Sequence, residues 1–416
     1  MRRFEVLIVG GGQAGASAAL ALRQLGFKGS LAIVTEETDP PYERPPLTKA
    51  YLAGEKPFER ILLRPAAFWS ERGVELVVGE RVAAVDPLLR QVSLASGGAL
   101  GYGALIWAAG GAPRRLSCLG HDLAGVHGVR TRTDVDAIIA ELPAVRSVVV
   151  VGGGYIGLEV AAVLTRLGKS VTVLEAQDRV LARVAAEPLS RFYEAEHRAH
   201  GVDIQLEARL DAILGREGRV RGVRLAGGEV LDAQLVVVGV GIAPAVAPLL
   251  EAGAAGGDGV VVDGQCRTSL VDVYAIGDCA RHRNPFAGGA EIRLESVQNA
   301  VDQAAGAAKA ILGGEETYHA VPWFWSDQYD LKLQTVGLSL GYDQVVVRGE
   351  PTSRSFTLVY FRQGRVIALD CVNNTRDYVQ GKALVLAGRV APPDRIADAS
   401  LLLRAITAEP AASLTT

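Results

Sequence analysis

Two glycine-rich segments, residues 6–15 and 148–157, have the residue types and the spacing that bind a dinucleotide. Each runs from β-branched residues into Gly-x-Gly-x-x-Gly and then into Ala and Leu at helical spacing, which predicts a strand, a tight turn and a helix. Glycines in such a turn let the backbone approach a pyrophosphate, and the helix N-terminus stabilises its charge. These glycines are Gly10, Gly12 and Gly15 in the first copy and Gly152, Gly154 and Gly157 in the second. Two copies predict two dinucleotides.

An acidic residue follows the next predicted strand in each copy. Glu36 comes after the strand at residues 31–34, and Glu175 after the strand at residues 170–174. A carboxylate at this place binds the hydroxyls of the adenosine ribose and repels a 2'-phosphate. Glu175 therefore predicts NADH rather than NADPH at the second site. The cationic residues Arg179 and Arg183, which follow it, count against this preference.

The cysteines exclude a thiol relay. Cys118, Cys266, Cys279 and Cys371 are far apart and form no Cys-x-x-Cys or Cys-x-x-x-x-Cys pair, whereas a dithiol reductase needs two thiols a few residues apart. Isolated cysteines of this kind are typical of small buried side chains in a reducing compartment. A cytoplasmic location is therefore expected.

The histidines predict no metal site. His197 and His200 lie three residues apart on a predicted helix with Glu194 and Glu196 close by, a spacing that can in principle hold a metal. We interpret them instead as part of a solvated helical face. The cluster of Arg281, His282 and Arg283 is interpreted in the same way, and Asp278 before it as the cap of a turn.

The proline-rich segment 40–49 has two interpretations. It contains Arg44 and Lys49 between and after prolines that prevent a helix before residue 46. It is either a rigid surface connector or a loop that places these two cations against the first cofactor. The spacing alone does not decide between them.

Length and composition describe a compact protein of several domains. At roughly 100 to 200 residues per domain, the 416 residues predict two to four domains, and 49% hydrophobic with 21% charged residues fits a well-packed globular chain. A formal net charge of -3 gives no basic footprint for nucleic acid, and no apolar run reaches the roughly 18 residues of a membrane span. Met1-Arg2-Arg3 is not expected to begin a secretory signal, because cleavage would remove the first strand and its glycine turn.

The internal repeat extends beyond the glycine turns and defines the fold class. Residues 74–113 alternate between apolar and polar and predict a small antiparallel sheet, whose ending, 105–113, is echoed at residues 235–244. We expect an α/β protein with two Rossmann-like domains and a C-terminal α+β domain. The expected boundaries are 1–114 with 244–318 for the first dinucleotide domain, 115–243 for the second, 319–404 for the C-terminal domain and 405–416 for a loose tail.

Five segments together resemble a known family. The two glycine turns, residues 44–49, residues 275–278 and residues 323–328 are similar to those of the FAD-dependent, NADH-oxidising ferredoxin reductases of bacterial oxygenase systems. This resemblance implies a fold of glutathione reductase type. Residues 291–297 and 193–202 resemble especially the putidaredoxin reductase branch, which serves heme monooxygenases; the reductase of biphenyl dioxygenase is also similar.

The resemblance implies a cofactor for each glycine turn. The first turn would bind FAD and the second NADH, with no metal. The residues implied at FAD are Gly10, Gly12, Ala14, Gly15, Glu36, Arg44, Lys49, Val82, Arg132, Asp278, Val297 and Trp325, and those at NADH are Gly152, Gly154, Ile156, Gly157, Glu175, Gly241 and Glu295. Lys49 and Glu159 are expected to form a charge pair beside the reactive edge of the flavin, although Glu159 can also be read as a helix-start carboxylate.

The implied activity is electron transfer from NADH through FAD to a [2Fe-2S] ferredoxin that feeds a heme monooxygenase. A flavin accepts a hydride and releases electrons singly, which an iron-sulfur acceptor requires. Two alternatives remain: a reductase for rubredoxin or for the ferredoxin of an aromatic-ring dioxygenase, and, in another class, an NADH-sensing flavoprotein with a binding role. The charge pattern does not locate the docking surface, for which Arg281 and Arg283 are candidates.

Overall fold

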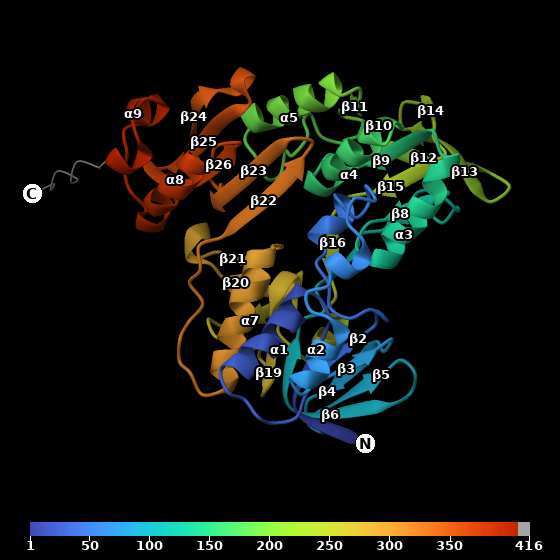
Figure 1. Cartoon of the computed structure of the whole chain (residues 1–416), viewed down its shortest axis with the longest axis vertical. Coiled ribbons are helices and arrows are strands. Elements are labelled where there is room, and N and C mark those ends of the chain that lie inside the picture. Colours follow the sequence, from blue (N-terminus) through green and yellow to red (C-terminus); the bar gives the residue numbers. More distant parts are fainter. Residues whose placement is uncertain (407–416) are drawn as a thin grey trace, which may run out of the picture. The chain divides into compact units, whose positions relative to one another are not determined.

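A computed structural model describes residues 1–406. The chain forms two compact units, of which the first comprises Met1–Pro46, Lys56–Ala112 and Ile242–Pro322, and the second Leu47–Glu55, Pro113–Gly241 and the chain from Trp323 onward (Figure 1). No helix within residues 1–406 has both the length and the apolar character that crossing a membrane requires. Of the tail predicted for 405–416, residues 407–416 lie outside the described residues.

The first unit is built on a parallel sheet that an antiparallel meander extends. The order is β3-β2-β1-β6-β5-β4, and β19 pairs with the part of β6 that β5 leaves uncovered. The strands are β1 (Arg2–Val9), β2 (Leu31–Thr35), β3 (Val74–Val78), β4 (Val82–Asp86), β5 (Gln91–Leu94), β6 (Ala99–Trp107) and β19 (Val273–Ala275). The antiparallel sheet predicted from residues 74–113 is confirmed for β4, β5 and β6 but is wrong for β3, which runs parallel to β2. Strand β3 alternates in polarity because it lies at the edge of the parallel sheet, where one face is less covered.

Alanine-rich helices cover one face of this sheet. Helices α1 (Gln13–Gln24) and α7 (Val297–Ile311) lie side by side (Figure 1) and share a core made largely of alanines such as Ala18 and Ala304, both fully buried. Small side chains allow the two helices to approach closely. The remaining elements are α2 (Ala66–Glu71), α6 (Ala247–Glu251), the paired strands β7 (Gly111–Pro113) and β16 (Ile242–Pro244), and a small sheet of β17 (Gly256–Gly257), β18 (Gly259–Val262), β20 (Ala280–Arg283) and β21 (Glu291–Arg293).

The second unit contains the second Rossmann-like sheet. Its five parallel strands follow the order β11-β10-β9-β15-β8. The valine run at residues 148–151 is buried, as expected of a central parallel strand. The elements are β8 (Val126–Gly128), α3 (Arg132–Glu141), β9 (Ser147–Val151), α4 (Tyr155–Arg166), β10 (Ser170–Leu174), α5 (Glu187–Ala199), β11 (Asp203–Gln205), a meander of β12 (Leu210–Arg216), β13 (Arg219–Leu225) and β14 (Val230–Asp232), and β15 (Leu235–Val238).

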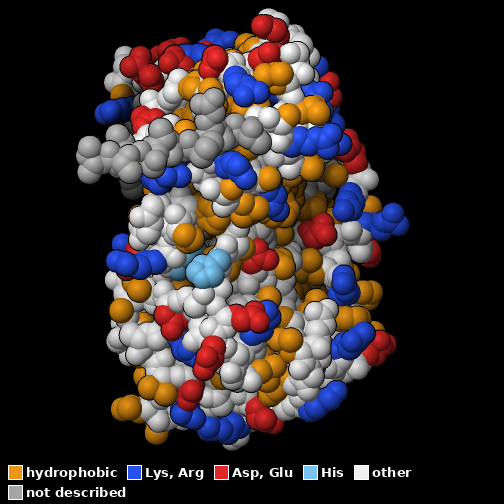
Figure 2. Space-filling view, turned by 90° about the vertical axis from the view of Figure 1, so that its left-hand side faces the viewer, with side chains coloured by type: hydrophobic (Ala, Val, Ile, Leu, Met, Phe, Trp, Pro, Cys, Tyr) orange, Lys and Arg blue, Asp and Glu red, His pale blue; other side chains and the backbone are white. Residues whose placement is uncertain are grey.

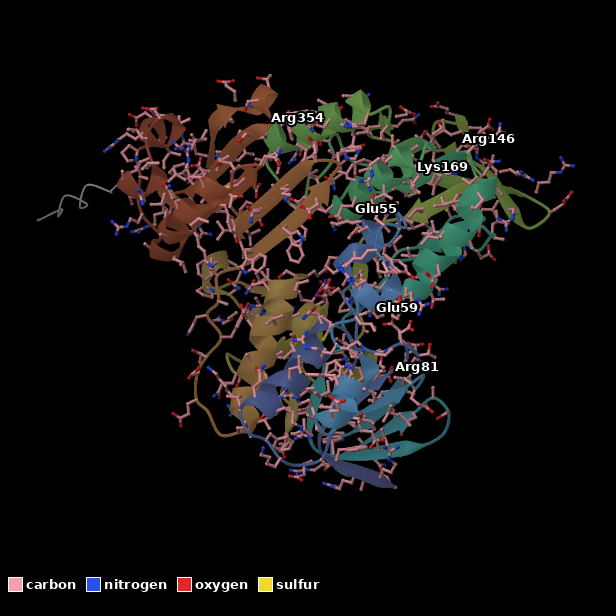
Figure 3. All side chains as sticks on the ribbon, viewed as in Figure 1. Glu55, Glu59, Arg81, Arg146, Lys169 and Arg354 are labelled. Carbon is pink, nitrogen blue, oxygen red and sulfur yellow. The ribbon has the colours of Figure 1, made fainter. Side chains whose placement is uncertain are left out.

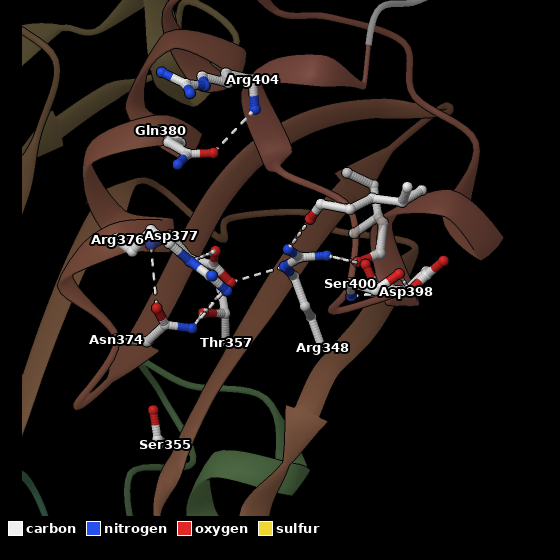
Figure 4. Close-up of polar contacts among 12 residues, drawn as sticks. Arg348, Ser355, Thr357, Asn374, Arg376, Asp377, Gln380, Asp398, Ser400 and Arg404 are labelled. Carbon is white, nitrogen blue, oxygen red and sulfur yellow. Dashed lines mark hydrogen bonds and ion pairs between the residues drawn. The ribbon is translucent and has the colours of Figure 1, made fainter.

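The C-terminal part of the second unit is an antiparallel sheet with helices. The order β22-β23-β26-β25-β24 joins β22 (Trp323–Gln328), β23 (Leu331–Gly337), β24 (Gln344–Glu350), β25 (Ser355–Arg362) and β26 (Arg365–Val372), followed by α8 (Thr375–Ala387) and α9 (Pro393–Ala397). Arg348 of β24 is 1% exposed and donates at 2.7 Å to Asp377 of α8, which is also 1% exposed. The same guanidinium donates to the carbonyls of Ile396, Asp398 and Leu401 (Figure 4). The buried guanidinium of Arg348 thus holds the end of the described chain against the sheet.

Candidate functional site

The first glycine turn leaves the start of α1 open to an anion. Gly10 has a φ of +112°, and a Cβ there would lie 2.3 Å from the carbonyl oxygen of Ala108; a Cβ on Gly15 would lie 2.0 Å from the carbonyl oxygen of Gly10. Both positions therefore require glycine. A Cβ on Gly12 would meet Arg44 first, at 3.8 Å, and Gly12 caps α1 without a side-chain hydrogen bond. The first N–H groups of α1 are thus left for a ligand such as a pyrophosphate.

Charged side chains surround this turn. Arg44 donates to the Glu37 carboxylate at 2.5 Å, which holds its guanidinium in place near the turn. Glu36 is exposed at the end of β2, and its carboxylate lies 3.9 Å from Arg81, which Figure 3 labels. Arg44 is therefore positioned to meet a phosphate, and Glu36 remains accessible to ribose hydroxyls.

Asp278 lies close to the start of α1 in the same unit. It belongs to η4 (Gly277–Cys279), where a Cβ on Gly277 would lie 3.0 Å from the Cβ of Ala14. The Gly277 N–H donates at 2.8 Å to Gln303 of α7, the helix that begins at Val297. The segment that carries Asp278 thus lies between the start of α1 and the first half of α7.

Two further predicted residues of the first unit have different surroundings. Val82 is 6% exposed in β4 and belongs to the core of the sheet. Glu295 is exposed and pairs with Arg293 at 2.9 Å, just before α7.

The second glycine turn repeats the geometry of the first. Gly152 has a φ of +109°, and a Cβ there would lie 2.5 Å from the carbonyl oxygen of Gly239, whereas a Cβ on Gly154 would meet nothing within 4 Å. Helix α4 begins directly after Gly154 without a side-chain cap. Ile156 in its first turn is 44% exposed, and Gly241 has a φ of +95° with open space at its Cβ position. The start of α4 is a second place for a pyrophosphate.

Both carboxylate oxygens of Glu175 are bonded to the backbone around this turn. Oε2 accepts from the N–H of Gly153 at 2.8 Å, and Oε1 accepts from the N–H of Gln177 at 2.9 Å. Arg179 donates to two backbone carbonyls and a serine hydroxyl of its own neighbourhood, while Arg183 is exposed. The carboxylate is therefore held at the turn, whereas Arg179 is bound elsewhere, and this arrangement favours a ribose without a 2'-phosphate.

Lys49 and Glu159 form a buried ion pair within the second unit. The distance from Lys49 Nζ to Glu159 Oε2 is 2.6 Å, and the side chains are 19% and 2% exposed. The Thr48 hydroxyl donates to the same oxygen at 2.6 Å, and the Ser326 hydroxyl donates to Oε1 at 2.6 Å. Glu159 lies beyond the first turn of α4, so a simple helix-start interaction does not account for it. A carboxylate with three donors and so little solvent is held in one orientation.

The segment Leu47–Glu55, which carries Lys49, is anchored in the second unit by further polar contacts. The Tyr51 hydroxyl donates to Asp136 at 2.5 Å, and Arg132 donates to the other oxygen of Asp136 at 3.0 Å. Glu55, labelled in Figure 3, pairs with Arg166 at 3.0 Å. These contacts fix residues 47–55 to the second unit, and the interpretation of residues 40–49 as a loop that places cations against the first cofactor stays a prediction.

Aromatic side chains gather on β22 of the same unit. The rings of Trp323 and Trp325 lie 5.7 Å apart, and Phe324 contacts Tyr155 of α4 with a centroid distance of 4.9 Å. Trp325 is half-buried. Side chains alternate along the strand, so Phe324 faces α4, whereas Trp323 and Trp325 lie on the opposite face of β22.

Comparison with known proteins accounts for both units. Residues 4–304 match the pyridine nucleotide-disulphide oxidoreductase family, and residues 323–407 match the reductase C-terminal family. The chain belongs to the pyridine nucleotide-disulphide oxidoreductase family. This reductase is 58% identical to the ferredoxin reductase subunit of 5,5'-dehydrodivanillate O-demethylase from Sphingobium sp., over 98% of this chain and 99% of the relative. It is 59% identical to a ferredoxin–NAD(P)(+) reductase of Sphingomonas sp., over 94% of each chain.

A solved structure shares the fold across the whole reductase. The covalent complex of putidaredoxin reductase with putidaredoxin matches with a TM-score of 0.93 and 37% identity, covering 97% of both chains. The expected fold class, two Rossmann-like domains with a C-terminal domain, is confirmed, and so is the resemblance to ferredoxin reductases of oxygenase systems. The chain is therefore an oxidoreductase of the ferredoxin–NAD(P)(+) reductase type, which uses FAD and NAD(P)H.

The residues of the chain fit these cofactors. Each of the two glycine turns has a position that only glycine can occupy and a helix start without a side-chain cap, as two dinucleotides require. Burial raises the pKa of both Cys266 and Cys279 to about 12, so these two side chains remain protonated thiols of low reactivity. Within residues 1–406 no group of three or more His, Cys, Asp or Glu is arranged to hold a metal ion.

Sequence reasoning missed several polar residues of the site. Glu37 holds Arg44, and Thr48 and Ser326 hold Glu159. Thr48 and Ser326 each lie in a segment that the sequence singled out, but their partner is more than a hundred residues away, so nothing local marked them.

The solvated face expected for His197 is wrong. His197 is fully buried, and its Nε2 lies 2.8 Å from Gln328 Oε1. His282, expected to be solvated between two arginines, is also buried, at 4% exposure. In both cases neighbouring charged residues gave a polar pattern, although the histidine itself faces the interior.

Proposed function

We propose that this reductase passes electrons from NADH to a [2Fe-2S] ferredoxin that feeds a heme monooxygenase. FAD, when bound, supplies the conversion between a hydride and single electrons. The proposal is carried by one combination of features. Helices α1 and α4 each begin after a glycine turn without a side-chain cap, and the chain has no cysteine pair. Since no dithiol can take the electrons onward within the chain, they must leave to a separate acceptor.

The residues of the first turn would hold FAD. The start of α1 and Arg44 would bind its pyrophosphate, Glu36 its ribose, and Asp278 its ribityl chain. The full set proposed for FAD is Gly10, Gly12, Ala14, Gly15, Glu36, Arg44, Lys49, Val82, Arg132, Asp278, Val297 and Trp325. The support is the gathering of Arg44, Asp278 and the starts of α1 and α7 within one unit.

The residues of the second turn would hold NADH, and the Lys49–Glu159 pair would stand beside the reactive edge of the flavin. The proposed NADH set is Gly152, Gly154, Ile156, Gly157, Glu175, Gly241 and Glu295. The buried geometry of the ion pair supports its role, because an ion pair is costly to bury and contributes little to stability over an apolar alternative. The domain boundaries 1–114 with 244–318, 115–243 and 319–404 remain a prediction, as does the cytoplasmic location.

The ferredoxin would dock through a local surface. On the face that Figure 2 shows, Lys and Arg side chains are interspersed with Asp and Glu side chains, and no large described area carries one sign. Arg281, a candidate contact, pairs with Glu291 at 3.5 Å, and Arg283 is exposed. The structure of a homologous reductase bound to putidaredoxin supports a ferredoxin as the acceptor.

A second candidate concerns the terminal oxygenase. The relative that is 58% identical serves an O-demethylase, whereas putidaredoxin reductase of Pseudomonas putida is 37% identical. An aromatic O-demethylase or dioxygenase system is therefore the alternative to a heme monooxygenase. Rubredoxin as acceptor has a parallel in relatives that are 39% identical. An NADH-sensing role has no parallel among these relatives, which are named as reductases.

The test mixes the FAD-bound protein with NADH and one purified acceptor at a time. We expect NADH to bleach the flavin absorbance and a [2Fe-2S] ferredoxin to restore it rapidly, with rubredoxin slower. A second assay adds a heme monooxygenase or an O-demethylase oxygenase, each with its own ferredoxin. It compares how much product each system forms per NADH consumed. A bleached flavin that no ferredoxin reoxidises would refute the proposal.

A further inference from the structure

A buried chain of hydrogen bonds leads away from Glu159 through the C-terminal domain. Ser326 donates to Glu159 Oε1 at 2.6 Å, and Gln328 Nε2 donates to Ser326 Oγ at 3.2 Å. Gln328 Oε1 lies 2.8 Å from His197 Nε2, and the Tyr329 hydroxyl lies 3.0 Å from His197 Nδ1. Ser326 and His197 are fully buried and Gln328 is 1% exposed. Water therefore has little access to these hydrogen bonds.

Every link of the chain has a defined direction. Glu159, paired with Lys49, is an acceptor only, so the Ser326 hydroxyl must donate to it and can only accept from the Gln328 amide nitrogen. The Gln328 oxygen is then an acceptor, which makes His197 Nε2 a donor and His197 Nδ1 the acceptor of the tyrosine hydroxyl. Burial lowers the pKa of His197 to about 4, so the ring is neutral and carries one N–H. All four links point toward the carboxylate, an arrangement in which each bond strengthens the next.

The direction of the links excludes an outward proton path. A proton leaving Glu159 would have to pass to a serine that already donates to Glu159, and then through an amide. Nor does packing require the chain, since apolar side chains of similar volume fill a buried site without the need to satisfy polar atoms. What remains is an effect on Glu159 itself.

The charged and titratable groups around the chain come from several elements. At the Glu159 end lie Lys49, Tyr155, Tyr193 and Asp370. At the other end the Tyr329 ring stacks on exposed His200 at 3.7 Å, and Glu196, next to His197, pairs with Arg354 at 3.0 Å. Of these, Lys49 contacts the Glu159 carboxylate directly.

We propose that Ser326, Gln328, His197 and Tyr329 are positioning residues that hold the Glu159 carboxylate in the orientation that keeps Lys49 in place. This inference rests on the proposed role of the Lys49–Glu159 pair in the hydride transfer. It gives the C-terminal domain and α5 a part in the reaction with NADH, beyond the contact expected of Trp325.

The central test replaces Gln328 by leucine in the FAD-bound enzyme. Infrared spectroscopy without NADH is expected to show a shifted Glu159 carboxylate stretching band in Gln328→Leu, because the hydrogen bond from Ser326 to Oε1 is weakened. Nitrogen-15 NMR of the histidine rings is expected to show His197 as the Nε2–H tautomer in the unaltered enzyme. In stopped flow, Gln328→Leu is expected to slow hydride transfer about three- to tenfold at unchanged NADH affinity, the effect of weakening one hydrogen bond to a charged group.

Controls separate this role from a merely structural one. Thr165→Val removes a buried hydroxyl on the same helix as Glu159, one without a partner among the described residues, and is expected to change neither the band nor the rate. In a Glu159→Gln background, Gln328→Leu is expected to have no further effect on hydride transfer, because the acceptor of the chain is already neutral. Ser326→Ala and Tyr329→Phe repeat the test at the two ends of the chain, should Gln328→Leu not fold.

The outcomes distinguish the two proposals. If Glu159→Gln alone leaves hydride transfer unchanged, the role proposed for the ion pair is wrong. If Glu159→Gln slows the transfer but Gln328→Leu neither slows it nor moves the carboxyl band, the ion pair stands and the positioning chain is refuted. Full additivity of the two substitutions would also refute the chain.

Discussion

Removing Lys49 and removing Glu159 should have unequal effects on stability. In Lys49→Met the carboxylate of Glu159, 2% exposed, loses its cation but keeps the hydroxyl donors Thr48 and Ser326 at 2.6 Å each. Breaking a buried ion pair from one side costs about 3–5 kcal/mol of unfolding free energy, and the two remaining donors place this case near the lower end. Glu159→Gln leaves Lys49, which is 19% exposed and can turn its ammonium toward water. We expect this variant to cost about 1–2 kcal/mol.

The double variant and the kinetics complete this prediction. Lys49→Met with Glu159→Gln should be more stable than Lys49→Met alone, because no uncompensated carboxylate remains. Urea unfolding of the FAD-saturated proteins at one pH measures the free energies, and stopped-flow bleaching of the flavin by NADH measures the single-turnover rate, which Lys49→Met should slow. A larger loss of stability in Glu159→Gln than in Lys49→Met would refute the electrostatic reasoning, and an unchanged single-turnover rate in Lys49→Met would refute the catalytic role.

Three further predictions concern separate parts of the chain. Glu175→Ala should lower kcat/KM for NADH about tenfold or more, the value of a hydrogen bond to a charged group, and lower that for NADPH less; equal losses in steady-state assays would remove its role in coenzyme choice. Burial raises the pKa of Asp370 to about 7, so the folded state keeps a proton that the unfolded state loses above about pH 4, and the contribution of Asp370 to stability should fall by about 2 kcal/mol from pH 5 to 7 and then level off. Asp370→Asn should abolish that fall in urea unfolding, and a slope as steep as before would contradict the assignment. Arg348→Met should cost about 3–5 kcal/mol by leaving Asp377 buried without its partner and should speed proteolysis of the C-terminal segment, whereas exposed Arg395→Met should do neither.

Local sequence patterns predicted the parts of the fold that depend on backbone conformation. The strand predicted at residues 170–174 is β10, and the helices predicted after the two glycine turns are α1 and α4. These elements follow from side-chain periodicity and from the glycines within a few residues. The direction of β3 was not predictable in this way, because it depends on which strand lies beside it.

The candidate site also has parts that the sequence predicts and parts that only the fold assembles. Positive φ values at Gly10 and Gly152 and the carboxylates Glu36 and Glu175 follow from short segments, so the sequence alone determined that two dinucleotides bind and that no thiol pair assists them. The partners of Glu159 come from 111 residues before it and 167 residues after it. Only folding brings such segments together, and burial then gives one carboxylate three donors and a directed chain of hydrogen bonds. Tertiary structure therefore decided which groups hold the Glu159 carboxylate in place, because hydrogen bonds between distant segments leave no local sequence pattern.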